Sequence, residues 1–590
     1  MPALWISDAI AGYSRGGCNE LDWTCNVDRL SEQLSHAPAS PGAGAQPLTC
    51  FRGINQTPLH PQFSKVMPLQ LHYLLRSTAK RPAIITKNYA RLSIRMVSSH
   101  QAPKLKDQSL FKQQGLINGQ WADAQSGETF TVTDPVNNAE IGTCPEMTRK
   151  EVAEAIDAAR KAFADFRNTT PRERSTILKK WHQLCMENAD DLAKILTWEN
   201  GKPLAEAQGE VKYGSAFFEW FAEEAVRLYG DVIPSSTKGN RIITLKQPVG
   251  VVGIITPWNF PIAMITRKVG AAIAAGCTVV CKPGAETPYS ALALAELGIR
   301  AGLPAGVFNI VTGEKNTKDI GLELTTNPSV RKISFTGSTA VGKILMQQSA
   351  STMKKCSFEL GGNAPFIVFD DADIDLAVAG AIACKFRASG QTCVCANRIY
   401  VQKGIYDKFA KAFVEKVNGF KLGSGFDPDT THGPLIHDRA VAKVKELVDD
   451  ATSKGAKVLT GGEKSELGKN FWPPTVLGGM TNDMRIAKDE IFGAVAPLFE
   501  FESEDDVIAL ANDTDVGLAG YFYSNNVNRI WRVAEALEVG MVGVNCAIIS
   551  DAVSPFGGVK ESGFGREGSK YGLDEYTVIK SVTFGNTGAK

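Results

Sequence analysis

Residues 251–256 read Val251-Val252-Gly253-Ile254-Ile255-Thr256, and residues 278–282 read Thr278-Val279-Val280-Cys281-Lys282. Neither run alternates apolar and polar residues, as a strand with one solvent-exposed face does. An apolar helical stretch at 262–276 separates them. Continuous Val/Ile runs are typical of parallel strands that helices bury on both faces. This part of the chain therefore predicts a doubly wound parallel α/β sheet.

The same alternation continues toward the C-terminus. It predicts helix 288–302, strand Val307–Val311, helix 318–326, strand Lys332–Phe335 and helix 340–350. Three amphipathic helices are predicted to cover the sheet: one after the capping box Thr148-Arg149-Lys150-Glu151, and two at Arg172–Glu199 and Leu204–Leu228. A second α/β unit is predicted from Gly362, with strand Phe366–Phe369 and a helix from Ile374.

The turns after the predicted strands are where a ligand is expected, because open α/β sheets bind ligands at the carboxyl ends of their strands. These turns are Thr256–Pro261, Lys282–Pro288 and Phe335–Gly342.

Composition excludes several classes of function. The 64 Lys and Arg nearly balance the 63 Asp and Glu, so the net charge of +1 gives no field to attract nucleic acid or an anionic membrane. No apolar run reaches the eighteen or so residues of a membrane span. Twelve cysteines are too dilute for a disulfide framework and lack the spacing of a zinc site, which favours a reducing compartment. The acids of 370–375 are better explained by helix capping than by a metal loop.

The N-terminal extension, residues 1–106, is expected to be largely disordered. No Asp or Glu occurs from Gln33 to Lys106, although ten Lys and Arg do. A basic, acid-free, Ser-containing segment is the composition of a mitochondrial presequence, and 67–100 fits it best. The alternative is a disordered cytoplasmic tail.

Two short stretches carry the chemistry. One is Gly390-Gln391-Thr392-Cys393-Val394-Cys395-Ala396-Asn397-Arg398, and the other is Phe358-Glu359-Leu360-Gly361-Gly362. A cysteine beside Gly and Thr supplies a nucleophile, and an acid in a Gly-rich turn can activate a thiol or a water. Taken alone, Cys393 would more often be a small buried apolar residue.

Together with Asn259 in Thr256-Pro257-Trp258-Asn259-Phe260-Pro261, these stretches resemble the aldehyde dehydrogenase superfamily, and within it the succinate-semialdehyde dehydrogenases. The resemblance runs from about Asp107 to Tyr576. It implies an aldehyde dehydrogenase-like fold with three parts and a homotetramer or homodimer. The parts are a cofactor-binding domain (107–230 and 250–361), a catalytic domain (362–574) and a small sheet for oligomerisation (231–249 and 575–590).

The resemblance implies three catalytic residues. Cys393 would attack the aldehyde, the amide of Asn259 and the Cys393 N–H would stabilise the oxyanion, and Glu359 would activate the hydrolytic water. Two structural alternatives stay open. Asn259 could cap the following helix, and Glu359 could form a structural ion pair.

The resemblance also implies a nicotinamide cofactor, without metal. In Gly337-Ser338-Thr339-Ala340-Val341-Gly342 a strand ends and a helix begins, so its amides can meet a pyrophosphate. The other implied cofactor residues are Thr256, Pro257, Trp258, Lys282, Glu490 and Phe492. Ala285 stands where NAD-specific members carry Glu, which favours NADP, although Glu286 could restore part of the barrier and NAD remains an alternative.

The implied substrate is a small aldehyde with a distal carboxylate. Arg267, Arg387 and Ser550 match the positions that hold such a group, and Arg suits it by bidentate pairing. The implied reaction is oxidation of succinate semialdehyde to succinate in 4-aminobutyrate breakdown. Glutarate semialdehyde is the nearest alternative. Cys395 is either a redox switch that forms a disulfide with Cys393 or a thiol packed beside the loop.

Overall fold

The computed structural model describes residues 102–588. The predicted presequence at 67–100 lies outside these residues, so mitochondrial targeting stays a prediction. No helix of the described chain is long and apolar enough to cross a bilayer.

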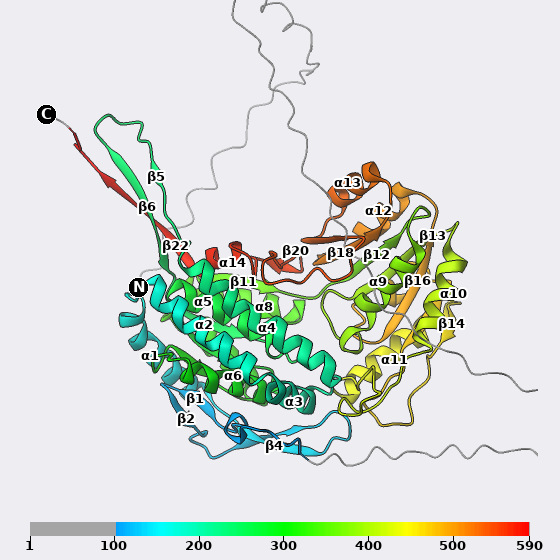
Figure 1. The fold of residues 1–590 in the computed structure, drawn as a ribbon, viewed down its shortest axis with the longest axis horizontal. Coiled ribbons are helices and arrows are strands. Elements are labelled where there is room, and N and C mark those ends of the chain that lie inside the picture. The colour runs from blue at the N-terminus through cyan, green and yellow to red at the C-terminus, as the bar shows by residue number, and fades with distance from the viewer. Residues whose placement is uncertain (1–101, 589–590) are drawn as a thin grey trace, which may run out of the picture. The chain divides into compact units, whose positions relative to one another are not determined.

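An eight-stranded sheet forms the first half of the described chain (Figure 1). Its strands, in spatial order, are β2 (Gln120–Ala122), β1 (Gly115–Ile117), β9 (Phe308–Ile310), β8 (Thr278–Lys282), β7 (Val251–Ile255), β10 (Val330–Thr336), β11 (Lys355–Glu359) and β21 (Gly563–Phe564). The run from β9 to β11 is parallel, and β1 and β21 flank it antiparallel. The predicted parallel α/β sheet is confirmed.

Helices cover both faces of this sheet. On one face lie α5 (Ala263–Ala275) and α6 (Pro288–Arg300), and on the other lie α1 (Arg149–Phe166), α7 (Thr317–Thr326) and α8 (Thr339–Ser349). The chain proceeds from β7 to β8 in one direction and from β10 to β11 in the other. The topological switch point therefore lies between β7 and β10, and their carboxyl ends open a crevice there.

The predicted helix Arg172–Glu199 is wrong in extent. It is two helices, α2 (Pro171–Glu187) and α3 (Ala189–Asn200). Asn188 between them has φ −107° and ψ 19°, and its Nδ2 donates to the Leu184 carbonyl at 2.8 Å. This local hydrogen bond competes with the helical backbone, as Asn side chains commonly do.

The expectation that all three early helices cover the sheet holds only for α1. Helices α2 and α4 (Leu204–Ala225) pack against each other and against α5. Every residue of α5 is buried, so α5 needs partners on its outer side as well as the sheet on its inner side. Helices α2 and α4 form an extra layer outside α5 (Figure 1).

A second, seven-stranded sheet forms most of the C-terminal half. Its order is β14 (Lys457–Thr460), β15 (Thr475–Gly478), β16 (Val495–Phe501), β13 (Ala396–Gln402), β12 (Ala364–Val368), β18 (Ala519–Tyr523) and β19 (Met541–Val544), all parallel except β14. The helices of this part are α9 (Ile374–Phe386), α10 (Tyr406–Val417), α11 (Asp438–Ser453), α12 (Glu504–Asn512) and α13 (Val527–Ala536).

The acids near 370–375 have structural partners. Asp373 caps α9 by accepting the Leu376 N–H, and Asp371 pairs with Arg529 at 2.7 Å. Within residues 102–588 no group of three His, Cys, Asp or Glu side chains is placed to hold a metal ion.

A three-stranded antiparallel sheet of β22 (Thr577–Phe584), β6 (Arg241–Pro248) and β5 (Val232–Ile233) projects from the rest of the described chain (Figure 1). All three strands lie within 231–249 and 575–590, where the small sheet is expected. Val232 and Ile579 on this sheet are 79% and 70% exposed, unusually high for apolar side chains. Its role in oligomerisation stays a prediction. The small pairs β3 (Thr129–Thr133) with β4 (Glu140–Pro145) and β17 (Val516–Gly517) with β20 (Val559–Lys560) complete the strands, and α14 (Tyr571–Asp574) precedes β22.

Candidate active site

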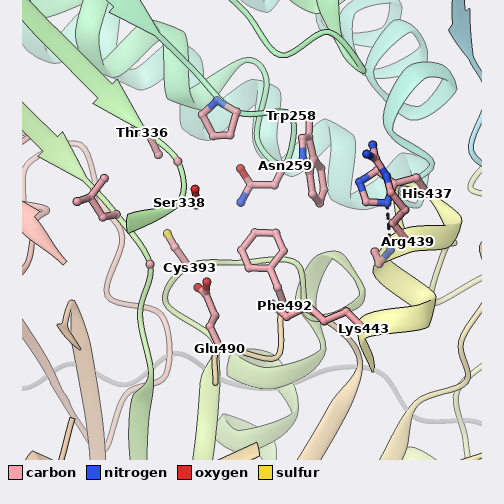
Figure 2. Close-up of a pocket in the computed structure, with 15 residues that line it drawn as sticks. Trp258, Asn259, Thr336, Ser338, Cys393, His437, Arg439, Lys443, Glu490 and Phe492 are labelled. Atoms are coloured by element: carbon pink, nitrogen blue, oxygen red, sulfur yellow. Dashed lines mark hydrogen bonds between the residues drawn. The ribbon is translucent and has the colours of Figure 1, made fainter. Parts of the chain in front are cut away.

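A cavity of about 310 Å³ opens at the switch point, at the lower end of the range of small-molecule sites. It is lined by Pro257, Trp258, Asn259, Thr336, Gly337, Ser338, Leu360, Gly361, Cys393, His437, Arg439, Ala440, Lys443, Glu490 and Phe492. Figure 2 shows Cys393 between Asn259 and Glu490, with Phe492 beside it. The loops after β7 and β10 and the segment before β13 thus meet at one place.

The Cys393 thiol lies at the junction of two cavities, because it also lines a second, smaller one. Burial raises the pKa of this thiol to about 12, with Glu359 and Glu490 adding to the rise and Arg267 opposing it. The thiol is protonated, so a base must take its proton before it can attack.

Asn259 faces the thiol loop. Its Nδ2 donates to the Gln391 carbonyl at 3.0 Å, and its buried Oδ1 has no hydrogen-bond partner within the described chain. The helix after it, α5, receives no cap from Asn259. Instead the Ile262 N–H donates to Glu210 at 3.0 Å. The Cys393 N–H has no acceptor in residues 102–588. This N–H and the second amide hydrogen of Asn259 are therefore available to an oxyanion.

Glu359 ends β11 and is only 3% exposed. It does not line the larger cavity. Its Oε1 lies beside Gly557, where a Cβ would come within 2.9 Å, and its Oε2 has no hydrogen-bond partner in the described part of the chain. Burial raises the pKa of Glu359 well above its usual value, and the nearby Glu567 carboxylate raises it further, while Lys268 and Arg267 oppose the rise. A carboxylate in this setting is a proton acceptor suited to neutral or alkaline pH.

Six predicted cofactor residues line the larger cavity. The Trp258 and Phe492 rings meet edge to face at 5.6 Å. Ser338 caps α8 by accepting the Val341 N–H, which places the helix N-terminus at the cavity wall. Glu490 accepts the Gly362 N–H at 3.2 Å, and burial raises its pKa. Gly337 and Pro257 also line the cavity.

The other predicted cofactor residues do not line this cavity. Lys282 is 4% exposed and donates to the Pro283 carbonyl at 3.1 Å, and burial lowers its pKa while Glu286 opposes the fall. Ala285 and Glu286 are half-buried beside it. Thr256 is buried, and its Oγ1 has no partner within residues 102–588. Gly342 lies against Leu360, where a Cβ would approach to 2.6 Å.

The smaller cavity, of about 10 Å³, brings together the three predicted substrate residues, Arg267, Arg387 and Ser550. Its remaining walls are Tyr213, Phe260, Met264, Thr392, Cys393, Val394 and Phe556. This volume is about that of one water molecule, so the cavity is a narrow site beside Cys393.

The two arginines of this cavity differ in what already binds them. The Arg267 Nη1 lies 3.5 Å from Glu567, and its Nη2 donates to the Tyr213 hydroxyl at 2.7 Å. Within the described chain no carboxylate lies within ion-pair distance of Arg387, whose guanidinium stacks over the Phe260 ring at 5.4 Å. Arg387 is therefore the cation with more capacity for a further anion.

Several lining residues were not predicted. His437, Arg439 and Lys443 reach the larger cavity from the start of α11, on the far side of Phe492 from Cys393 (Figure 2). Tyr213 reaches the smaller cavity from α4. Each lies on a helix or its cap with ordinary amphipathic spacing, so the sequence carries no local signal for it.

Cys395 is 5% exposed, and its Sγ lies 3.4 Å from the Gly390 carbonyl and 3.5 Å from that of Lys385. Burial raises its pKa. The thiol is packed beneath the loop, and its role as a redox switch stays a prediction.

The family described as aldehyde dehydrogenases has a model that matches residues 121–582. The chain belongs to the aldehyde dehydrogenase family. This aldehyde dehydrogenase is 57% identical over 482 residues to the Escherichia coli protein named succinate-semialdehyde dehydrogenase (NADP(+)) GabD, a match that covers 82% of this chain and 100% of the relative. It is also 57% identical to glutarate-semialdehyde dehydrogenase of Pseudomonas putida, over 81% of this chain and 98% of the relative.

The fold of this aldehyde dehydrogenase is similar to that in the crystal structure of succinate-semialdehyde dehydrogenase from Burkholderia pseudomallei. The TM-score is 0.81 at 55% identity, and the match covers 82% of this chain and 100% of the other.

Proposed function

We propose that this aldehyde dehydrogenase oxidises succinate semialdehyde to succinate with NADP or NAD as the hydride acceptor. The small cavity carries the proposal, because Arg387, Arg267 and Ser550 face the side of Cys393 away from the larger cavity. A short aldehyde could place its carbonyl at the thiol and its carboxylate at Arg387. The similar relatives from E. coli and P. putida are both named for semialdehydes that carry a distal carboxylate.

In the proposed mechanism Glu359 takes the proton of the Cys393 thiol, and the thiolate attacks the aldehyde carbon. The oxyanion of the resulting thiohemiacetal accepts hydrogen bonds from the Asn259 amide and the Cys393 N–H. After the aldehyde hydrogen leaves as hydride, the acyl group remains on Cys393 as a thioester. Once Glu359 has released the thiol proton to solvent, it takes a proton from the water that attacks the thioester, and the carbon–sulfur bond breaks to give succinate and the Cys393 thiolate.

The residues of the larger cavity fit a dinucleotide. The N-terminus of α8 at Ser338 suits a pyrophosphate, and Glu490 offers an acceptor near Cys393 for a ribose hydroxyl. The unpaired Oγ1 of Thr256 is a further buried polar atom without a protein partner within residues 102–588. When bound, the nicotinamide supplies the hydride acceptor. Among the protein's own groups, Trp258 and Phe492 would enclose the ring.

Replacing Arg387 with glutamine should lower kcat/KM for succinate semialdehyde about 30- to 100-fold, because one charge-assisted hydrogen-bonding partner of the carboxylate is lost. Propanal, which lacks a carboxylate, should change by less than about threefold. Initial rates of cofactor reduction with both aldehydes measure this. Arg331→Gln, at an exposed arginine on β10, is the matched control. Equal losses with both aldehydes, or no loss with succinate semialdehyde, would contradict the proposed binding of the substrate carboxylate by Arg387.

The same assay with the parent enzyme compares succinate with glutarate semialdehyde. The narrowness of the smaller cavity favours the shorter chain, so kcat/KM should be higher with succinate semialdehyde. A preference for glutarate semialdehyde would still agree with carboxylate binding by Arg387, but it would make glutarate semialdehyde the substrate.

The preference for NADP should depend on Ala285. A carboxylate in Ala285→Glu would repel a 2′-phosphate and accept a hydrogen bond from a 2′-hydroxyl, so the ratio of kcat/KM for NADP to that for NAD should fall about tenfold or more. Glu286→Ala should move the ratio the other way, because it removes the neighbouring negative charge. An unchanged ratio in both variants would show that the cofactor is selected elsewhere.

A further inference from the structure

The backbone just before Cys393 has an uncommon conformation. Ala388 and Ser389 have φ of 51° and 54°, and Gly390 follows with φ of 78°. Residues with a side chain seldom adopt this left-handed region, and they stay there only where surrounding contacts hold them. The turn 388–390 separates Arg387 from the loop that carries Cys393. The groups that hold this turn therefore set the positions of both.

Glu206 on α4 holds the turn from one side. The Ala388 N–H lies 3.0 Å from one oxygen of its carboxylate and 3.3 Å from the other. From the other side, the Ser389 hydroxyl donates to the Gly433 carbonyl at 2.9 Å, and the Gln391 side-chain oxygen accepts the Ile436 N–H at 2.9 Å.

Two residues near the start of α4 hold the loop of Asn259: Lys202, which lies just before the helix, and Glu210, one turn after Glu206. The Lys202 ammonium donates to the Asn259 carbonyl at 2.8 Å and to Glu210 at 2.5 Å, and Glu210 accepts the Ile262 N–H. The loop of Asn259 and the turn before Cys393 are thus both held by side chains of α4 and of the residue just before it.

We propose that Glu206 is a positioning residue, which fixes the left-handed turn at 388–390 by accepting the Ala388 N–H and so aligns Cys393 with Asn259. This inference rests on the proposed function. In this role Glu206 needs a side chain long enough to bring an oxygen atom to the Ala388 N–H, and its charge does not matter. A different role, as a counter-charge for the nearby Arg387, would depend on its negative charge.

Three substitutions separate these roles. Glu206→Gln keeps an oxygen acceptor at the same reach without charge, Glu206→Asp keeps the charge one methylene short of the turn, and Glu206→Ala keeps neither. We expect kcat/KM within about fivefold of the parent for Gln, and losses of about 30- to 100-fold for Asp and Ala, since a misplacement near 1 Å costs about that much. The loss should appear with propanal as well as with succinate semialdehyde, because the reacting thiol is shared.

The binding constant of NADPH, followed by its fluorescence, should stay unchanged in all three, because Glu206 does not line the cofactor cavity. Glu219→Ala, at an exposed glutamate of the same helix, is the matched control and should equal the parent. The order Asp above Gln, or an Ala variant within about threefold of the parent, would overturn the proposal. So would losses confined to succinate semialdehyde. The proposed function is tested separately, with the parent enzyme. A higher kcat/KM with propanal than with succinate semialdehyde would contradict the proposed function and not the role of Glu206.

Discussion

Alanine at position 393 should abolish dehydrogenase activity, with kcat reduced about 10⁴-fold or more, because the acyl group then has no sulfur on which to form. The protein should still fold and bind NADPH, since the thiol is a small group between two cavities that exist without it. The measurements are initial rates of cofactor reduction and the fluorescence of bound NADPH.

The matched control for this substitution is Cys546→Ala, at an exposed cysteine away from both cavities, which should keep parental rates. Residual activity above about one per cent of the parent in the Cys393 variant, with its mass verified, would remove the covalent mechanism.

Glutamine at position 359 should lower kcat about 10²- to 10⁴-fold, the usual contribution of a general base. The pH profile carries more information than the rate. Burial and the Glu567 carboxylate raise the pKa of Glu359, so its basic form is scarce at low pH. The kcat of the parent should therefore rise with pH until Glu359 has lost its proton, and then level off.

The Glu359→Gln variant should lack this rising limb, because glutamine does not titrate in this range. Rates measured from pH 5 to 10 in both proteins test it. If the variant keeps the same limb as the parent, another group is the base.

The parallel sheet could be predicted because each of its strands has a recognisable pattern in the local sequence. Residues 251–256 and 278–282 are buried on both faces, and each strand therefore needs an unbroken apolar run. The break between α2 and α3 could not, because apolar spacing continues through it from Trp181 to Leu192. The break falls at Asn188, whose side chain donates to the Leu184 carbonyl.

The candidate site divides in the same way. Cys393, Asn259 and Glu490 lie in short motifs, and the structure brings them together. The pairing of Arg267 with Glu567, 300 positions away, and the seat of Glu359 beside Gly557 depend on tertiary packing that no local pattern encodes. The same holds for Glu206, which acts on a turn 182 positions away.

The most direct test of the whole account is the mass of the parent protein after its reaction with NADP and succinate semialdehyde is stopped with acid within the first turnover. Acid stops hydrolysis of a thioester, so the acyl-enzyme formed in that turnover should be retained. The account predicts that the protein gains the mass of one succinyl group and that peptide mapping places it on Cys393. Reduced cofactor formed without any adduct, or an adduct on another residue, would contradict it.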